Sequence, residues 1–212
     1  MTVKTMDLPA GAFLSSSTAR SINTVTIQQG QILNAGHVLG EVLNTTITAT
    51  AATGNTGDGT VTGLSTVTGL KKGTYDLTII QKAPDGGQFQ LRDPRGKVVG
   101  FGVVGVAFVE AGLSFTLQDG STDFVLGDRF TIEVESTGKV IEWNPGNTDG
   151  SDTPAGILFA AIDATDQDRK GVMVSREASV ITADLSFFDG ATPDDIQAAG
   201  ESLALHKIDL LS

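Results

Sequence analysis

The stretch Tyr-Asp-Leu-Thr-Ile at residues 75–79 decides the fold class, because its large apolar residues alternate with polar ones. A period of two places the apolar side chains on one face of an extended strand, whereas a helix needs a spacing of three or four. Runs with the same alternation or a similar apolar content recur at short intervals, and turn sequences rich in Gly, Pro and Asp separate them. Short strands joined by such turns indicate a small antiparallel sandwich or barrel. The further runs of this kind are residues 89–91, 98–109, 113–117 and 130–134.

The composition agrees with a β-rich protein that buries a core. Hydrophobic residues make up 40% of the 212 residues, and charged residues make up only 18%, below the usual quarter. The 26 glycines, together with frequent Thr, Ser and Val, favour strands and tight turns over helices. We therefore expect a mainly β fold of one large or two small domains.

The formal net charge of −11 bears on the partners that the protein can bind. Proteins that grip nucleic acid neutralise phosphates with clustered Lys and Arg, and here 14 scattered basic residues face 25 acidic ones. We expect no nucleic-acid partner. The absence of cysteine excludes disulfides and thiolate sites.

No segment of the sequence has the pattern of a membrane span or a signal peptide. The first 17 residues lack a charged start and a continuous apolar core. The longest apolar run, residues 98–109, is too short for a bilayer and is interrupted by Gly100, Gly102 and Gly105. We expect no membrane partner.

One helix is predicted near the C-terminus. Thr192 suits the N-cap, Pro193 suits the first helical position, and Asp194 and Asp195 face the positive end of the helix dipole. The tail at residues 208–211 is expected to return to a sheet. At the other end of the chain, residues 1–20 have no clear period and are interpreted as a flexible, extended arm.

The motifs that suggest chemistry each have a simpler interpretation. Gly100, Gly102 and Gly105 match a dinucleotide fingerprint in spacing, but they lie in an apolar β run with no helix after it. The segment 119–123, Asp-Gly-Ser-Thr-Asp, lacks the further carboxylates of a calcium loop and is read as a turn. We therefore expect no enzyme activity, no catalytic residues, no cofactor and no metal.

Trp143 is the only tryptophan and stands at the end of a predicted strand, before Asn144 and Pro145. Two interpretations stay open with equal weight. The side chain packs in the core beneath a turn, or Trp143 and Pro145 form a contact between subunits, where Trp is favoured.

A resemblance rests on the C-terminal part of the chain and a shorter piece near the start. Residues 139–143 give a Lys-hydrophobic-x-x-Trp strand, 148–150 a Thr-Asp-Gly turn, and 155–158 an Ala-Gly-Ile-Leu strand, with the Thr192 helix closing the chain. Residues 35–40, Ala-Gly-His-Val-Leu-Gly, add a second motif. In order and spacing these pieces resemble the phage lambda-type head decoration proteins.

The resemblance implies a domain organisation. It covers residues 21–43 and 138–212, which form a discontinuous decoration-protein core of α+β type with one C-terminal helix. Residues 44–137 depart from the family pattern, because the short founding member of the family has no such segment. They are expected to form an antiparallel β-sandwich inserted into a loop of the core, where an insertion costs little if its ends stay close.

The resemblance also implies a function. Such proteins bind as homotrimers at the three-fold and quasi-three-fold sites on the outside of the expanded head, and they stabilise it against the pressure of the packaged DNA. The partners would be the major capsid protein and two further copies of the chain, in a virion assembled in the host cytoplasm. The arm would order on the capsid by strand addition. The expected capsid-binding residues are Leu8, Phe13, Leu14, Ile22, Val25 and Ile27.

Two alternatives stay open beside this interpretation. In the first, the protein is a phage surface adhesion or glycan-binding module, and its inserted domain contacts the host surface. A tail component is the other alternative. Closed trimers would favour decoration, whereas six-fold rings or tubes would favour a tail.

Overall fold

The computed structural model describes residues 8–17 and 21–211, and most of its regular structure is β-strand. One α-helix lies near the C-terminus, so the predicted fold class is confirmed. The chain divides into two compact units. Unit 1 comprises residues 1–42, 138–146 and 151–212, and unit 2 comprises residues 43–137 and 147–150.

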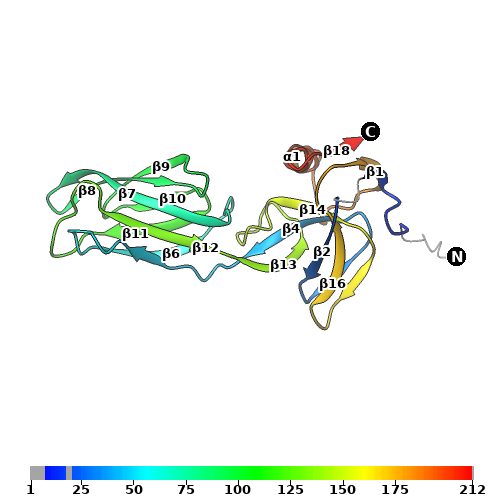
Figure 1. Ribbon diagram of the computed structural model, residues 1–212, viewed down its shortest axis with the longest axis horizontal. Helices are drawn as coiled ribbons and strands as arrows, with labels where there is room; N and C mark the ends of the chain where they lie inside the picture. The colour runs from blue at the N-terminus through cyan, green and yellow to red at the C-terminus, as the bar shows by residue number, and fades with distance from the viewer. Residues whose placement is uncertain (1–7, 18–20, 212) are drawn as a thin grey trace. The chain divides into compact units, whose positions relative to one another are not determined.

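Unit 2 consists of two antiparallel sheets (Figure 1). The five-stranded sheet has the order β5-β12-β7-β8-β9 and the three-stranded sheet the order β10-β11-β6. The strands are β5 (Ala49–Ala51), β6 (Thr60–Thr66), β7 (Gly73–Ala83), β8 (Gly86–Arg92), β9 (Val98–Val103), β10 (Ala107–Glu110), β11 (Leu113–Gln118) and β12 (Arg129–Val134).

The core of unit 2 follows the alternation seen in the sequence. Every second residue of β12 is buried, and β7 buries Tyr75, Leu77 and Ile79 in the same way. The side chains of both sheets meet in one apolar cluster. The Tyr75 hydroxyl accepts a hydrogen bond from the Lys71 N–H at 2.8 Å and donates one to the Ala111 carbonyl at 3.0 Å, so its polar end is satisfied inside the core.

The apolar run at residues 98–109 is two strands and not one. A turn with Gly105 at φ 81° separates β9 from β10. Gly100 and Gly102 lie in β9 because aromatic rings pack directly against the strand. A Cβ on Gly102 would overlap the Phe89 ring, and a Cβ on Gly100 would lie 2.7 Å from Cζ of Phe108. The glycine spacing therefore reflects packing against the rings of Phe89 and Phe108.

Unit 1 is built around a closed barrel with the strand order β13-β2-β16-β14-β4. The core of the barrel contains Ile27, Leu39, Val140, Leu158 and Met173, one or more from each strand. The strands are β2 (Ile22–Ile27), β4 (Val38–Leu43), β13 (Ser136–Glu142), β14 (Pro154–Leu158) and β16 (Arg169–Val174), with a small sheet of β3 (Gln31–Leu33) and β15 (Ile162–Ala164) beside them.

A second sheet of unit 1 has the order β1-β17-β18, from β1 (Leu14–Ser17), β17 (Ala178–Ile181) and β18 (Ile208–Leu211). β17 is antiparallel to β1 and parallel to β18. The return of the C-terminal tail to a sheet is therefore confirmed. A 3-10 turn, Thr182–Asp184, follows β17.

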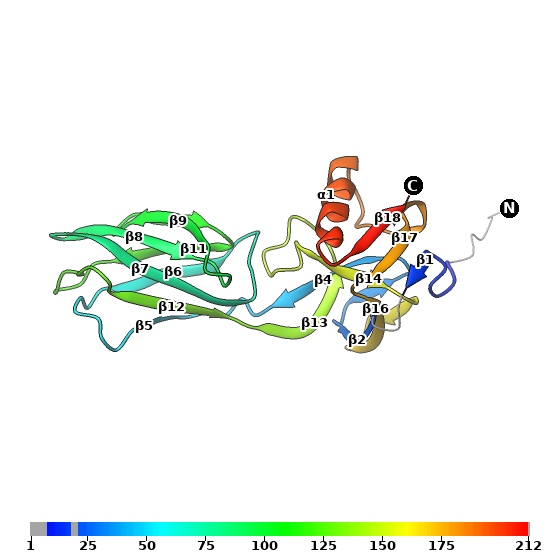
Figure 2. The same cartoon turned by 45° about the horizontal axis from the view of Figure 1, so that its top comes forward.

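The helix α1 (Pro193–Ala204) lies against β18, as Figure 2 shows. It begins as the sequence predicts. The Thr192 hydroxyl accepts the Asp195 N–H at 3.2 Å, and the Asp195 carboxylate accepts the Thr192 N–H at 2.9 Å. This capping box satisfies two helix-end donors. The hydrogen bonds from Thr192 lower the pKa of Asp195. No helix in the described part of the chain is long and apolar enough to cross a membrane.

Candidate functional site

The N-terminal residues that the structure describes lie on the body of unit 1. The Gly11 N–H donates to the Phe159 carbonyl at 2.8 Å, and β1 pairs with β17. Phe13 is fully buried in the cluster beneath that sheet, and Leu8 and Leu14 pack half-buried against it. The interpretation of residues 1–20 as a flexible arm is therefore wrong for residues 8–17. Residues 1–7 and 18–20 lie outside the described part.

The second group of predicted capsid-binding residues belongs to β2, which is already a strand of the barrel. It pairs antiparallel with β16 along its whole length, and its residues Thr26 and Ile27 pair in parallel with β13 on the other side. Ile27 is fully buried in the barrel, Val25 is half-buried and Ile22 is 39% exposed. Strand addition at Ile27 would require opening the barrel, and the capsid-binding role of Ile22, Val25 and Ile27 stays a prediction.

β1 is an edge strand of its sheet. In the sheet order β1-β17-β18, β1 has β17 as its sheet neighbour among the described residues. Its residues 15–17 are exposed serines. An edge strand of this kind presents backbone groups to which an external strand can pair. The run Leu-Ser-Ser-Ser carries no apolar alternation, which is why the sequence pattern did not reveal it.

Trp143 lies in the core of unit 1. It is 2% exposed and packs with Val38, Ala199 and the rings of Phe187 and Phe188. Its indole N–H donates to the Asp152 carbonyl at 2.7 Å. Of the two open interpretations, these contacts favour core packing, because a buried ring has little surface to offer a second subunit. Pro145, in the turn that follows, is half-buried.

A groove of about 460 Å³ opens at the barrel of unit 1 and is lined by residues of all five strands. Its floor is apolar, with Val25, Val140 and Met173. The charged side chains around it are Lys139, Lys170, Arg176 and Glu41, together with His206. Barrel mouths with an apolar floor and a few polar groups are common binding sites. No sequence pattern pointed to this groove, because its residues come from distant strands.

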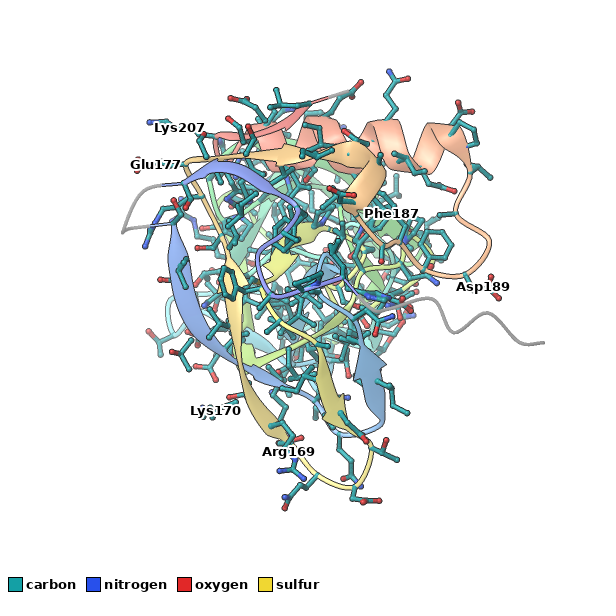
Figure 3. All side chains as sticks on the ribbon, turned by 90° about the vertical axis from the view of Figure 1, so that its right-hand side faces the viewer. Arg169, Lys170, Glu177, Phe187, Asp189 and Lys207 are labelled. Carbon is teal, nitrogen blue, oxygen red and sulfur yellow. The ribbon has the colours of Figure 1, made fainter. Side chains whose placement is uncertain are left out.

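Hydrogen bonds hold the basic side of the groove in place. Lys170 Nζ donates to the Thr26 hydroxyl at 2.7 Å, and Lys139 forms an ion pair with Asp168 at 2.8 Å. The hydrogen bond from Lys139, joined by the Gln29 N–H, keeps the pKa of Asp168 below its usual range. Figure 3 shows Lys170 at the lower left and Lys207 at the upper left of the same face of unit 1.

A group of three carboxylates lies at the loops of unit 2. Oxygens of Asp85, Asp119 and Asp123 come within 4.8 Å of one another. The segment 119–123 is a loop, in which Asp119 accepts the Gly120 N–H at 3.1 Å. Asp123 accepts the Asp85 N–H at 3.2 Å, which ties this loop to the β7–β8 turn. These bonds tie the two loops together, but Oδ2 of Asp119 is buried without a hydrogen-bond partner among the described residues. The absence of a metal stays a prediction.

The chain belongs to the bacteriophage lambda head decoration protein D family, whose model matches residues 3–208. The match takes in both units of the chain. The resemblance found in the sequence is thereby confirmed, and the protein has a role in capsid decoration in the virion.

Other comparisons add little. Two crystal structures of FlgL from Xanthomonas campestris, in space groups H3 and C2, align with 20% identity and a TM-score of 0.34. The alignments cover 47% of this chain and 34% and 33% of theirs, so the chain spans about a third of their length. A likeness this low bears on neither fold nor function. The search of curated proteins gave no match.

Proposed function

We propose that the protein is a homotrimeric cement protein that binds the outside of the expanded head at its three-fold and quasi-three-fold sites. Bound there, it stabilises the shell against the pressure of the packaged DNA. The observation that carries the proposal is the family match over residues 3–208, which takes in the barrel, the β1 sheet and the helix of unit 1. A binding protein of this kind needs no catalytic residues.

The N-terminal segment provides the contact with the capsid in this proposal. Residues 1–7 precede residues 8–13, which pack on unit 1 and lead into β1, and an external strand of the major capsid protein would pair with the outer edge of β1. Ordering a peptide segment costs roughly 1–2 kcal/mol per residue, so one copy would bind weakly. Three linked segments would raise the avidity by about 10²–10⁴. Trimerisation is therefore part of the binding mechanism.

Unit 2, in the same proposal, is a β-domain inserted into the decoration core and directed away from the shell. A host-surface contact through this unit is favoured by β9, where Phe101 is 68% exposed and Val103 is 46% exposed. Both alternate with the inward-facing Gly102, so they share one face of the strand. Replacing both with Ser would lower adsorption of virions to host cells if this contact exists, and head binding would not change.

The decisive test is co-sedimentation of the purified protein with expanded heads that lack decoration. Saturation at three copies per three-fold site, together with heads that survive a higher temperature, is the expected result. Heads of the cognate phage that bind no protein would refute the proposal. Deleting residues 1–7 tests the segment itself, since it leaves β1 and Phe13 in place. We expect at least ten-fold weaker head binding, and unchanged binding would refute the role of the segment.

A further inference from the structure

The inference rests on the homotrimer of the proposed function. Such a trimer requires contact surfaces on each subunit. Three copies around a three-fold axis meet through a heterologous interface, in which one patch of each subunit contacts a different patch of the next. Each chain must therefore carry two complementary surfaces. A single self-complementary patch would give a two-fold dimer instead.

The first surface is the groove at the barrel. Lys139, Lys170 and Arg176 line it against a single acidic side chain, Glu41. Lys139 is already paired with Asp168, so Lys170 and Arg176 are the groove cations that acidic side chains of a partner would meet. Lys170 and Arg176 are exposed at its rim, and the floor between them is apolar. The groove suits acidic side chains carried on a surface with small apolar residues.

The second surface is the outer face of α1. Asp194, Gln197, Ala198 and Glu201 are spaced by three or four residues, so they form one exposed stripe, and they line a shallow hollow of about 250 Å³. The helix contains no Lys or Arg. The Gln197 amide donates to Glu201 at 3.0 Å, which orders the stripe. Ala198 leaves room between the two acidic residues.

The two surfaces share no residue. In Figure 3, Lys170 and Lys207 lie on the left of unit 1, whereas Asp189, in the loop before α1, lies on the right. Asp189 and the loop that leads into α1 therefore lie on the opposite side from Lys170, which lines the groove. One copy can offer its helix while its groove receives the helix of another copy.

We propose that the groove of each subunit receives the acidic face of α1 from the neighbouring copy, and that this contact closes the trimer. Lys170 and Arg176 meet Asp194 and Glu201 of the next subunit, and Ala198 lies over the apolar floor. The occupant is a second copy because this chain itself carries the complementary charge. Charge pairs at the rim of an interface set its register and its salt dependence.

Charge reversal tests the contact in the full chain. Lys170→Glu with Arg176→Glu turns the groove acidic and changes the net charge from −11 to −15, because each reversal adds two negative charges. We expect trimer association, measured by sedimentation velocity across a concentration series, to weaken roughly ten- to hundred-fold. The control, Lys82→Glu with Lys97→Glu, makes the same charge change on exposed residues of unit 2 and should leave the trimer intact.

The opposite reversal, Asp194→Lys with Glu201→Lys, should weaken the trimer to a similar degree. Combining all four substitutions restores attraction with exchanged signs and returns the net charge to −11. We expect the combined variant to form trimers again, with the same sensitivity to salt. A thermal melt of each variant shows that the monomer fold is intact, because all four side chains are exposed.

The outcomes separate this inference from the proposed function. If the unaltered protein is a monomer at every concentration, both free and on heads, the trimer itself is refuted. If it is a trimer and both pairs of reversals leave it unchanged, the groove and the helix face are not the interface. Loss of the trimer in both reversals without recovery in the combined variant would also overturn the pairing. Recovery in the combined variant is the result that the proposal requires.

Discussion

Replacing Trp143 with Phe measures how much this side chain contributes to the core of unit 1. The indole N–H donates to the Asp152 carbonyl at 2.7 Å, and losing that bond inside the core costs about 1 kcal/mol. The smaller ring also buries less apolar surface, on the order of 40 Å², which costs about 1 kcal/mol more. We expect the free energy of unfolding of unit 1 to fall by about 2 kcal/mol.

Differential scanning calorimetry is the assay, because the substitution removes the only tryptophan and with it the fluorescence signal. A loss of this size lowers the Tm of unit 1 by roughly 8–16 °C. The matched control is Phe101→Leu, an aromatic residue that is 68% exposed on β9, and it should change stability by less than about 0.5 kcal/mol.

The result that would refute the reasoning is specific. If Trp143→Phe melts like the unaltered protein but its trimer dissociates at least ten-fold more readily, the side chain is a subunit contact after all. A lower Tm with unchanged trimer association at 20 °C is what core packing predicts.

Two further predictions concern unit 2. Gly102→Ala places a methyl group into the aromatic core and should destabilise unit 2 by roughly 1–3 kcal/mol, which lowers its Tm. The control Gly54→Ala, with open space around it, should be neutral. Calorimetry distinguishes the two variants, and the fluorescence of Trp143 should show that unit 1 is unaffected. Burial alone would raise the pKa of Asp128, but the N–H groups of three residues donate to its carboxylate and lower it below its usual range. Because the folded-state pKa lies below the unfolded one, this carboxylate stabilises unit 2 above about pH 4 and ceases to do so as the pH falls through the folded value. In urea titrations at a series of pH values, Asp128→Asn should therefore flatten the loss of stability of unit 2 between pH 5 and pH 2, and an unchanged pH profile would contradict this.

Local patterns gave correct predictions where the signal lies within a few neighbouring residues. The alternation of β7 and β12 predicted both the strands and the faces that they bury, because a period of two repeats along one strand. The cap at Thr192 predicted the start of α1, since a capping box involves residues only three apart. The family motifs likewise depend on short spacings along the chain.

The functional residues were less predictable. Phe13 stood among Ser, Ala and Gly and was assigned to an arm, but it fills the core beneath β17. Ile22, Val25 and Ile27 formed a good strand in the sequence, yet nothing there showed that this strand pairs with β16 and, at Thr26 and Ile27, with β13. Which strand pairs with which depends on residues more than a hundred positions apart, and no local pattern records it.

The sequence by itself therefore determined the β-rich class, the helix and its cap, the excess of negative charge and the decoration-protein motifs. Only the tertiary structure decided that Trp143 is a core residue, that β1 is an edge strand among the described residues, and that Lys139, Lys170 and Arg176 line one groove. The physical reason is that periodicity fixes which face of an element is buried. Barrel closure and the packing of distant segments then decide which residues meet on the surface.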